Sequence, residues 1–479
     1  MAGWVDSRLG LSFPLLRPVP QFALNPFYWL GALAVVAFVI QGVTGMMMML
    51  YYVPSPSQAY SSTQYIFQSV YNGRFLETVH LYTAYAMIML AFMHMMRGYF
   101  VSVQKKPREV MWVVGMLMGF VTLGFGFTGY LLPWTVVSKS ATDVGIGMVS
   151  ALPPPLSSLL TFLIVGSGGD AAELLRFFDL HVVILPAVLL ILLVVKMYML
   201  EAHGISEPTG GASAPSKRKS TPIFPDVTMY LLELSLLFGA GMLLISAVFP
   251  LGLPPEYSAA AQQSIPQPDW YFLWIYQVLK VSIFEGPTGL AAALSAITLV
   301  FLALILLPFL DRGKTRELSR RPVYTTLGLV FVGEVLMLSY WGFTTPGITI
   351  PVEQAVFVIG GTALLIAVGS LLVYRLLYSR AKGMLTTAPK ESLASTEVRS
   401  GLAFSALVAV GALSIGLLVN SLVGLWLGEN SLASWLSLLG AGALLTLDVL
   451  GSVYLIYRLD LRTGTIRRRI RSLEVGWKN

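Results

Sequence analysis

Residues 77–103 read ETVHLYTAYAMIMLAFMHMMRGYFVSV, and this apolar segment carries two histidines, His80 and His94. Their interval of fourteen residues is close to four turns of α-helix, which places both imidazoles on one face, roughly 21 Å apart along the axis. That length is most of a membrane hydrocarbon core of about 30 Å. A polar side chain at this depth is a candidate functional residue. The segment therefore predicts a membrane-spanning helix with one histidine near each surface, both pointing into a bundle.

Glycine pairs with the same fourteen-residue interval flank this segment on both sides. Gly31 and Gly45 lie in the preceding apolar segment, and Gly115 and Gly129 lie in the following one. Because glycine has no Cβ, a flat macrocycle can approach the helix backbone closely at these positions. One such pair among 44 glycines is expected by chance, but three coincident intervals on three successive helices are not. The pattern predicts a cage for two haems, with these glycines as cofactor-binding positions.

The composition is that of a polytopic membrane protein. Of 479 residues, 56% are hydrophobic and 11% are charged, and the mean hydropathy is +0.74. The chain has no cysteine, which excludes disulfides, cysteine-ligated iron–sulfur clusters and thioether-attached haem. Any haem is therefore non-covalent, and any iron–sulfur centre must lie on a partner. The net charge of +7 comes from basic loops and requires no nucleic-acid partner.

The predicted fold is all-α, a polytopic transmembrane bundle of about ten spans. Ten spans put both termini on the same side, and the basic residues of the loops on that side predict that it is cytoplasmic, in a prokaryotic plasma membrane. His80 then lies toward the outside. We expect four parts: a four-helix di-haem bundle (1–205), a cytoplasmic linker (206–222), further helices (223–380) and a two-span extension with a basic tail (381–479). The expected spans are 27–52, 77–103, 110–133, 177–201, 226–249, 288–309, 323–343, 353–377, 401–426 and 432–457.

The fourth expected span supplies the other candidate ligands. His181 lies near its outer end and can pair with His80 across one haem. A partner for His94 is needed about four turns further on, where Lys196 stands fifteen residues beyond His181. His203 is too far along the helix to be level with His94, and it is either a loop-end histidine or a proton donor to an inner-side ligand. The other soft ligands nearby are Met197 and Met199.

Two arginines lie about one helical turn from the histidines. Arg97 follows His94, and Arg176 precedes His181. The guanidinium fork binds carboxylates with two parallel hydrogen bonds, which suits the propionates of a haem. The alternative is that these side chains extend to lipid headgroups.

Five short motifs resemble a known family: QKKPRE at 104–109, GYLLPW at 129–134, RFFDLH at 176–181, PDWY at 268–271 and RRPV at 320–323. Together they resemble the cytochrome b of the quinol-oxidising cytochrome bc family. The resemblance covers roughly residues 10–375, with the two polypeptides of the plastid branch joined through residues 206–222. Residues 401–457 match nothing in that family.

The resemblance implies that His80 and His181 hold the outer haem, and that His94 and position 196 hold the inner one. The haems would be of b type or a type. The chain departs from the family at Lys196, where the plastid branch has histidine, and at Glu77, where the family usually has arginine. The helix-A cysteine is also missing, so the extra haem of the plastid branch is not expected.

The mechanism that the resemblance implies is quinol oxidation near the outer surface, with electrons crossing the membrane through the two haems, coupled to proton translocation. Asp269 would accept a proton from quinol, because desolvation beside aromatic rings raises a carboxylate pKa. Tyr130 and Tyr271 would form walls of that site. Asp226, assisted by His203, would supply protons for quinone reduction near the cytoplasm.

The implied partners are a Rieske-type iron–sulfur protein, quinol, membrane lipid and a second copy of the chain in a homodimer. One alternative is a cytochrome b-like subunit with haems of a type, bound to the subunits of a terminal quinol oxidase. A less favoured alternative is a membrane transporter without redox function.

Overall fold

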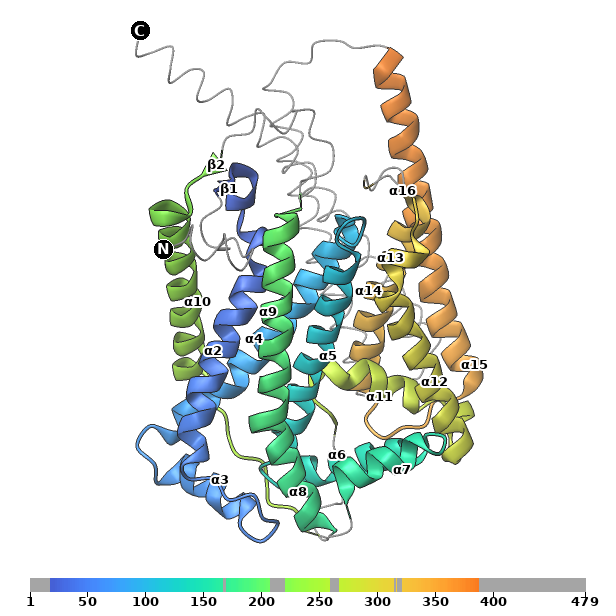
Figure 1. Cartoon of the computed structure of the whole chain (residues 1–479). Helices are drawn as coiled ribbons and strands as arrows, with labels where there is room; N and C mark the ends of the chain where they lie inside the picture. Colours follow the sequence, from blue (N-terminus) through green and yellow to red (C-terminus); the bar gives the residue numbers. More distant parts are fainter. Residues whose placement is uncertain are drawn as a thin grey trace. The chain divides into compact units, whose positions relative to one another are not determined.

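The computed structural model describes residues 18–166, 169–206, 220–258, 267–313, 316 and 321–386, so the expected spans at 401–426 and 432–457 lie outside the described residues (Figure 1). The described residues form two compact units. The first contains 18–206, 220–258, 267–268 and 286–313, and the second contains 269–285, 316 and 321–386.

The predicted all-α membrane fold is confirmed. In the described part of the chain, eight helical segments are long and apolar enough to cross a membrane. They correspond to the first eight expected spans: Leu30–Met49, Gly73–Phe100, Glu109–Leu131, Asp170–His203, Ile223–Val248, Gly286–Ile305, Pro322–Thr344 and Val352–Leu372.

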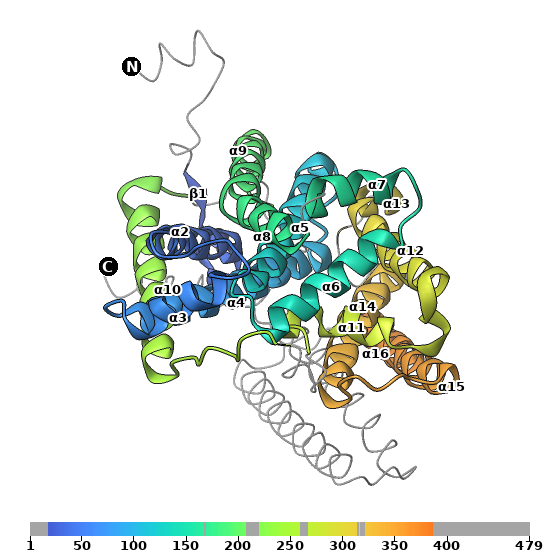
Figure 2. The same cartoon turned by 90° about the horizontal axis from the view of Figure 1, so that it is seen from below.

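Four helices of the first unit position the candidate ligands: α2 (Leu30–Met49), α4 (Gly73–Phe100), α5 (Glu109–Leu131) and α9 (Leu185–His203). Helix α2 packs against α4, α4 against α5, and α5 against α9 (Figures 1 and 2). Both His80 and His94 therefore belong to one uninterrupted helix, α4, as the sequence predicts.

The fourth span begins earlier than predicted and contains a local irregularity. Helix α8 (Asp170–Asp179) continues through a π-helical turn, η5 (Leu180–Ile184), into α9. Pro186 lies in the first turn of α9 and has no N–H to donate to a preceding carbonyl, which favours a wider turn just before it. His181 lies in this π-helical turn, a feature that is frequent at functional sites.

Short helices occupy one end of the first unit, which we call the short-helix end (Figure 1). They are α3 (Ala59–Gln68), α6 (Val136–Ser150), α7 (Leu156–Leu160), η4 (Thr161–Val165) and α8. Apart from the end of α8, these elements lie between the expected spans. Helix α6 forms there because the Thr135 hydroxyl accepts a hydrogen bond from the Ser138 N–H at 3.2 Å, which caps the first turn.

The opposite end of the first unit, the strand end, carries a two-stranded antiparallel pairing of β1 (Val19–Pro20) with β2 (Ser220–Thr221) (Figure 1). Val19 pairs with Thr221, and Pro20 pairs with Ser220. Two 3₁₀ turns, η2 (Gln21–Leu24) and η3 (Pro26–Tyr28), lead from β1 into α2.

Two further spans pack within the first unit. Helix α10 (Thr228–Val248), preceded by η7 (Ile223–Val227), packs against α2 and α4. Helix α12 (Gly286–Ile305) and the short α13 (Leu307–Leu310) pack against α5, where the Trp112 indole donates to the Leu304 carbonyl at 2.8 Å. The first unit therefore contains helices from both sides of residues 206–222.

The second unit is built around α11 (Leu273–Leu279), α14 (Pro322–Thr344) and α16 (Gly361–Thr386). An ideal Cβ at Gly342 would lie 2.7 Å from the Leu273 carbonyl oxygen, so only glycine lets α11 lie this close to α14. The buried core of this unit is Val281, Leu338, Trp341, Ile350, Ala355 and Val358. Its shorter elements are η9 (Trp270–Phe272), η10 (Ser282–Phe284), α15 (Val352–Ala355) and η12 (Val356–Gly360).

Candidate redox site

His80 on α4 and His181 in the π-helical turn face each other. Their ring centroids are 6.4 Å apart, with an angle of 62° between the ring planes. Metal–imidazole bonds in proteins are about 2 Å long, so a metal held between two imidazole nitrogens separates the ring centroids by about 6 Å. The separation of the two rings therefore fits one metal centre with both histidines as axial ligands.

Two threonines fix the tautomers of these histidines. The Nδ1 atom of His80 lies 2.8 Å from Thr44 Oγ1, and the Nδ1 atom of His181 lies 3.0 Å from Thr128 Oγ1. Each hydroxyl also donates to the backbone carbonyl four residues earlier, at 2.7 Å and 2.8 Å respectively. Because a hydroxyl has one hydrogen, Nδ1 must be the donor in each threonine–histidine bond. The Nε2 lone pair of each ring is then left for a metal.

The matched glycines lie directly behind these rings. An ideal Cβ at Gly45 would lie 3.3 Å from His80 Cε1, and one at Gly129 would lie 2.7 Å from His181 Cε1. Each glycine follows one of the two threonines in the sequence, so one Thr-Gly step contacts each ring. We call this arrangement the His80 level.

The second glycine pair contacts the other two candidate ligands. An ideal Cβ at Gly31 would lie 3.1 Å from His94 Cε1, and one at Gly115 would lie 3.1 Å from Lys196 Nζ. Lys196 therefore lies beside Gly115 of α5 in the way that His181 lies beside Gly129, fourteen residues further along the same helix. We call this arrangement the His94 level.

The His94 level has no counterpart of the threonines. The residues before its glycines are Leu30 and Val114, which carry no hydroxyl. His94 Nδ1 is buried and makes no hydrogen bond within the described part of the chain. One turn beyond His94, the Arg97 guanidinium lies 3.7 Å from the centroid of the Tyr28 ring. This level therefore combines two possible nitrogen ligands with a nearby cation, but it leaves the histidine ring less restrained.

Two residues close in sequence to the His80-level ligands, Glu77 and Arg176, differ in their contacts. Glu77, one turn before His80, has a buried Oε2 atom that makes no hydrogen bond with the described residues. Arg176 donates a hydrogen bond to the Phe162 carbonyl and contacts Gly166, both in the segment before α8. The assignment of Arg176 to a haem propionate stays a prediction.

The predicted proton acceptor lies in the second unit. The Tyr271 hydroxyl donates to Asp269 Oδ2 at 3.0 Å, and Tyr271 itself is buried. The Trp270 ring meets the Tyr271 ring edge-on, with centroids 5.5 Å apart. The motif at 268–271 therefore holds a carboxylate in an aromatic setting, as its sequence predicts.

The structure adds a cation that the sequence gave no reason to select. Lys280 follows α11, and its ammonium donates to the carbonyl and, at 3.1 Å, to the hydroxyl of Thr345. It also lies 4.8 Å from the centroid of the Tyr276 ring. Burial lowers the pKa of Lys280 to about 8. No local motif marks this lysine, because its partner is distant in the sequence.

The remaining predicted residues are accessible or engaged through their backbones. Tyr130 ends α5, where its carbonyl accepts from the Ser138 hydroxyl at 2.8 Å. Asp226 in η7 and His203 at the end of α9 are both exposed. Within the described residues, no hydrogen bond or ion pair joins the Asp226 and His203 side chains, and the roles of all three residues stay predictions.

Comparisons with known proteins identify the family to which the chain belongs. Residues 85–256 match the family described as cytochrome b (N-terminal)/b6/petB, and residues 260–364 match cytochrome b (C-terminal)/b6/petD. A cytochrome bc complex cytochrome b subunit of Chlorobaculum thiosulfatiphilum is 33% identical over 350 residues, 71% of this chain and 80% of that protein. A cytochrome b6 of Heliobacterium mobile is 40% identical over 192 residues, 40% of this chain and 90% of that protein.

An archaeal relative and a solved structure extend the similarity. A cytochrome b of Sulfolobus acidocaldarius is 30% identical over 399 residues, 77% of this chain and 70% of that protein. A chain of a hyperthermophilic respiratory complex III has a TM-score of 0.60 and 25% identity, covering 78% of this chain and 96% of that one.

These observations define a membrane helical bundle in which the rings of His80 and His181 face each other between helices. The chain belongs to the cytochrome b family and is similar to the cytochrome b subunits of bc-type respiratory complexes. Membership of this family implies haem binding and electron transport in a membrane.

Proposed function

We propose that the chain is the cytochrome b subunit of a bc-type quinol-oxidising respiratory complex and carries two non-covalent haems. His80 and His181 would hold one haem, and His94 and Lys196 would hold the other. The observation that supports this most is that each of the four matched glycines contacts one of these four side chains. A bound haem supplies a one-electron carrier at each level.

The residues of the chain orient and shield the ligands. Thr44 and Thr128 hold the His80-level rings in the tautomer that presents Nε2. At the His94 level, Lys196 must present a neutral amine, and its position among apolar helices favours the uncharged form. Arg97, whose guanidinium lies over the Tyr28 ring, would bind a propionate.

We assign Asp269 and Tyr271 to the quinol-oxidising site. Asp269 accepts a proton from quinol, and its hydrogen bond from Tyr271 orients the carboxylate. The His80 level faces the outside of a prokaryotic plasma membrane and both termini are cytoplasmic, as the basic loops predict. Asp226 and His203 deliver protons for quinone reduction at the cytoplasmic side, and the overall electron transfer is coupled to proton translocation.

The proposed partners are a Rieske-type iron–sulfur protein and a second copy of the chain. The absence of cysteine from the sequence requires that an iron–sulfur centre be carried by another subunit. Copurification followed by subunit identification tests this proposal. Recovery of terminal oxidase subunits in place of an iron–sulfur protein would favour the quinol oxidase alternative.

Haem content tests the proposed cofactors. Acid acetone should extract all haem from the purified chain, at two haems per polypeptide, and a pyridine haemochrome spectrum should identify the haem type. His80→Leu should lose one haem, whereas His203→Leu, on an exposed helix end, should lose none. A stoichiometry of one or zero in the unmodified protein would reject the two-haem proposal.

The Asp269 assignment has a separate test. Asp269→Asn keeps the shape of the side chain but removes the proton acceptor, so quinol turnover should fall by ~10²-fold or more. Haem content should not change. Glu285→Gln is the matched control, because it removes an exposed carboxylate from the same unit. Equal turnover in the two variants would reject the assignment.

A further inference from the structure

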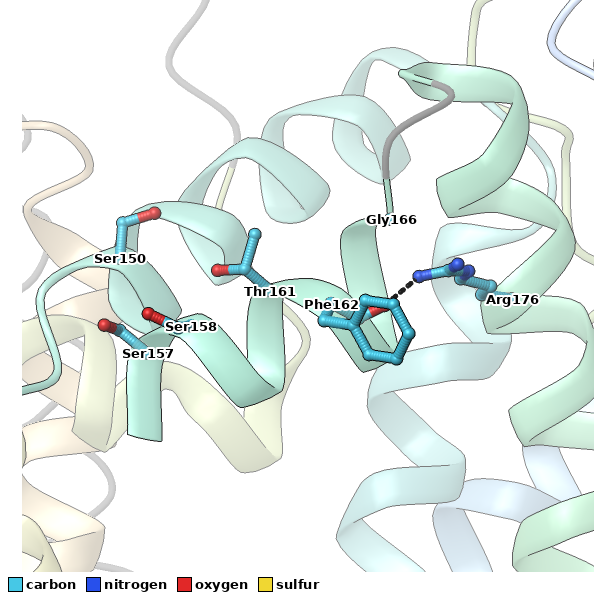
Figure 3. Close-up of a pocket in the computed structure, with 7 residues that line it drawn as sticks. All are labelled: Ser150, Ser157, Ser158, Thr161, Phe162, Gly166 and Arg176. Atoms are coloured by element: carbon cyan, nitrogen blue, oxygen red, sulfur yellow. Dashed lines mark hydrogen bonds between the residues drawn. The ribbon is translucent and has the colours of Figure 1, made fainter. Parts of the chain in front are cut away.

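A cavity of about 540 Å³ lies at the short-helix end of the first unit, between the end of α6, α7, η4 and α8 (Figure 3). Its polar lining consists of Ser150, Ser157, Ser158, Thr161 and Arg176, and Phe162 contributes an apolar wall. None of these residues belongs to the four glycine–ligand contacts. We call this cavity the serine–arginine pocket.

The polar groups of the pocket are available to a ligand. Within the described part of the chain, the hydroxyls of Ser150, Ser157, Ser158 and Thr161 have no hydrogen-bond partner. No acidic side chain lines the pocket. Two acids of α6 and α8, Asp143 and Asp170, are engaged elsewhere, since they lie 2.5 Å and 3.3 Å from Lys139 Nζ. The pocket is therefore a cluster of neutral hydroxyls with one positive charge.

Arg176 is fixed in place but not saturated. Its guanidinium donates to the Phe162 carbonyl, which Figure 3 shows as a dashed line. An ideal Cβ at Gly166 would lie 2.5 Å from Arg176 Cζ, so this glycine, at φ +74°, lets the guanidinium lie against the chain. A guanidinium has five N–H donors, and the bond to the Phe162 carbonyl uses one of them. The remaining donors suit a bidentate bond to an oxyanion.

The surroundings of the pocket identify the source of the oxyanion. Leu156, Leu159, Phe162 and Leu163 are 48%, 54%, 69% and 54% exposed. They belong to α7 and η4, the elements that supply the hydroxyls of Ser157, Ser158 and Thr161. Helix α8, which supplies Arg176, continues into a membrane-spanning segment. A short segment with exposed apolar side chains and a polar, cationic side is suited to the interface between headgroups and acyl chains.

We propose that the serine–arginine pocket binds the phosphate group of a membrane phospholipid. Arg176 forms the charged, two-pronged contact to the phosphate, and the hydroxyls donate to its remaining oxygens. The acyl chains lie against the exposed leucines and Phe162. This site shares none of the four proposed haem ligands, but it assigns Arg176 to a lipid phosphate in place of the haem propionate that the sequence predicts.

Native mass spectrometry of the intact protein in a mild detergent tests the proposal. Phosphatidylglycerol is titrated in one arm, a galactosyl diacylglycerol without phosphate in a second, and inorganic phosphate in a third. We expect one phosphatidylglycerol to be retained most tightly. Arg176→Gln should weaken its binding at least about tenfold, because the contact is a charged hydrogen bond. Arg312→Gln, at an exposed arginine two residues after the end of α13, is the matched control.

The double variant Ser157→Ala/Ser158→Ala provides a test that keeps the Arg176–Phe162 bond intact. It should also weaken phosphatidylglycerol binding, whereas Ser57→Ala/Ser61→Ala, in the segment at α3, should not. Equal binding of the galactolipid would overturn the phosphate assignment. Binding of inorganic phosphate but not of lipid would overturn the lipid source. Unchanged lipid binding in Arg176→Gln, with an altered haem spectrum or the loss of a copurified protein, would overturn the pocket in favour of a propionate or docking role.

Discussion

At the His80 level each ligand ring has a glycine beside Cε1 and a threonine hydroxyl at Nδ1. At the His94 level a glycine lies beside each ligand, but the residue before that glycine carries no hydroxyl. The two levels share the helices α2, α4, α5 and α9 and the same fourteen-residue glycine interval. They differ in the residue before each glycine and in one ligand type.

The difference separates two properties of a haem cage. At both levels, the absence of a glycine side chain lets a ligand side chain lie close to the helix backbone. Ring orientation and ligand basicity depend on the outer hydrogen bonds, which only the His80 level has. We therefore expect a rigid bis-histidine centre at one level and a more adaptable centre, with an amine ligand, at the other.

The largest expected effect comes from filling the space behind a doubly held ring. Gly129→Ala would bring a methyl group to 2.7 Å from His181 Cε1, and the ring cannot withdraw without breaking its bond to Thr128. The variant should lose the His80-level haem, about half of the total haem content. Gly119→Ala on the same helix, with no atom within 4 Å of its Cβ, is the control. Full haem content in Gly129→Ala would break the comparison.

The threonine bonds should have the next largest effect. Thr128→Val keeps the side-chain shape but removes the hydroxyl that accepts from Nδ1 of His181, so haem affinity at the His80 level should fall by about 10–100-fold. Thr122→Val removes a hydroxyl that donates only to the Met118 carbonyl of the same helix and serves as control. Haem titration of the apoprotein measures both affinities. Indistinguishable affinities would mean that the threonine bonds are incidental.

The reverse change sharpens the same comparison. Leu30→Thr supplies a hydroxyl one residue before Gly31, the position that Thr44 occupies before Gly45. If the hydroxyl reaches His94 Nδ1, haem retention at the His94 level should increase. Retention unchanged or lowered would show that sequence position alone does not reproduce the His80-level contact.

The smallest expected effect concerns the cation at the His94 level. Tyr28→Leu removes the ring that lies 3.7 Å from the Arg97 guanidinium, and the free energy of unfolding should fall by about 0.5–1 kcal/mol. Tyr71→Leu, at a 91% exposed tyrosine, is the control for thermal unfolding in detergent. An equal change in both variants would show that the Arg97 contact contributes nothing specific.

Much of the membrane fold follows from the sequence, because long apolar segments have few alternatives in a bilayer. Its short helices do not. Helix α6 has a weakly apolar sequence and depends on the Thr135 cap, and α3 packs against α4 through only a few buried residues. These elements form through contacts that a hydropathy pattern does not contain.

The candidate site was predictable at the level of residues but not of contacts. The shared interval of fourteen residues identifies the four glycines. Together with the two histidines of α4, it indicates that the ligands lie at two levels. The threonine contacts were missed, although a signal was present: the same Thr-Gly step occurs at 44–45 and 128–129 but not at 30–31 or 114–115. Only the packing of α2 on α4 and α5 on α9 shows that this step faces a histidine ring.

Magnetic resonance of the oxidised protein tests the central claim most directly, that His94 and Lys196 form the second ligand pair. The account predicts two low-spin haem signals in the unmodified protein. Lys196→Met should alter one signal, and Met197→Leu, at the neighbouring alternative ligand, should alter neither. A high-spin haem in the unmodified protein, or two low-spin signals that Lys196→Met leaves unchanged, would contradict the account.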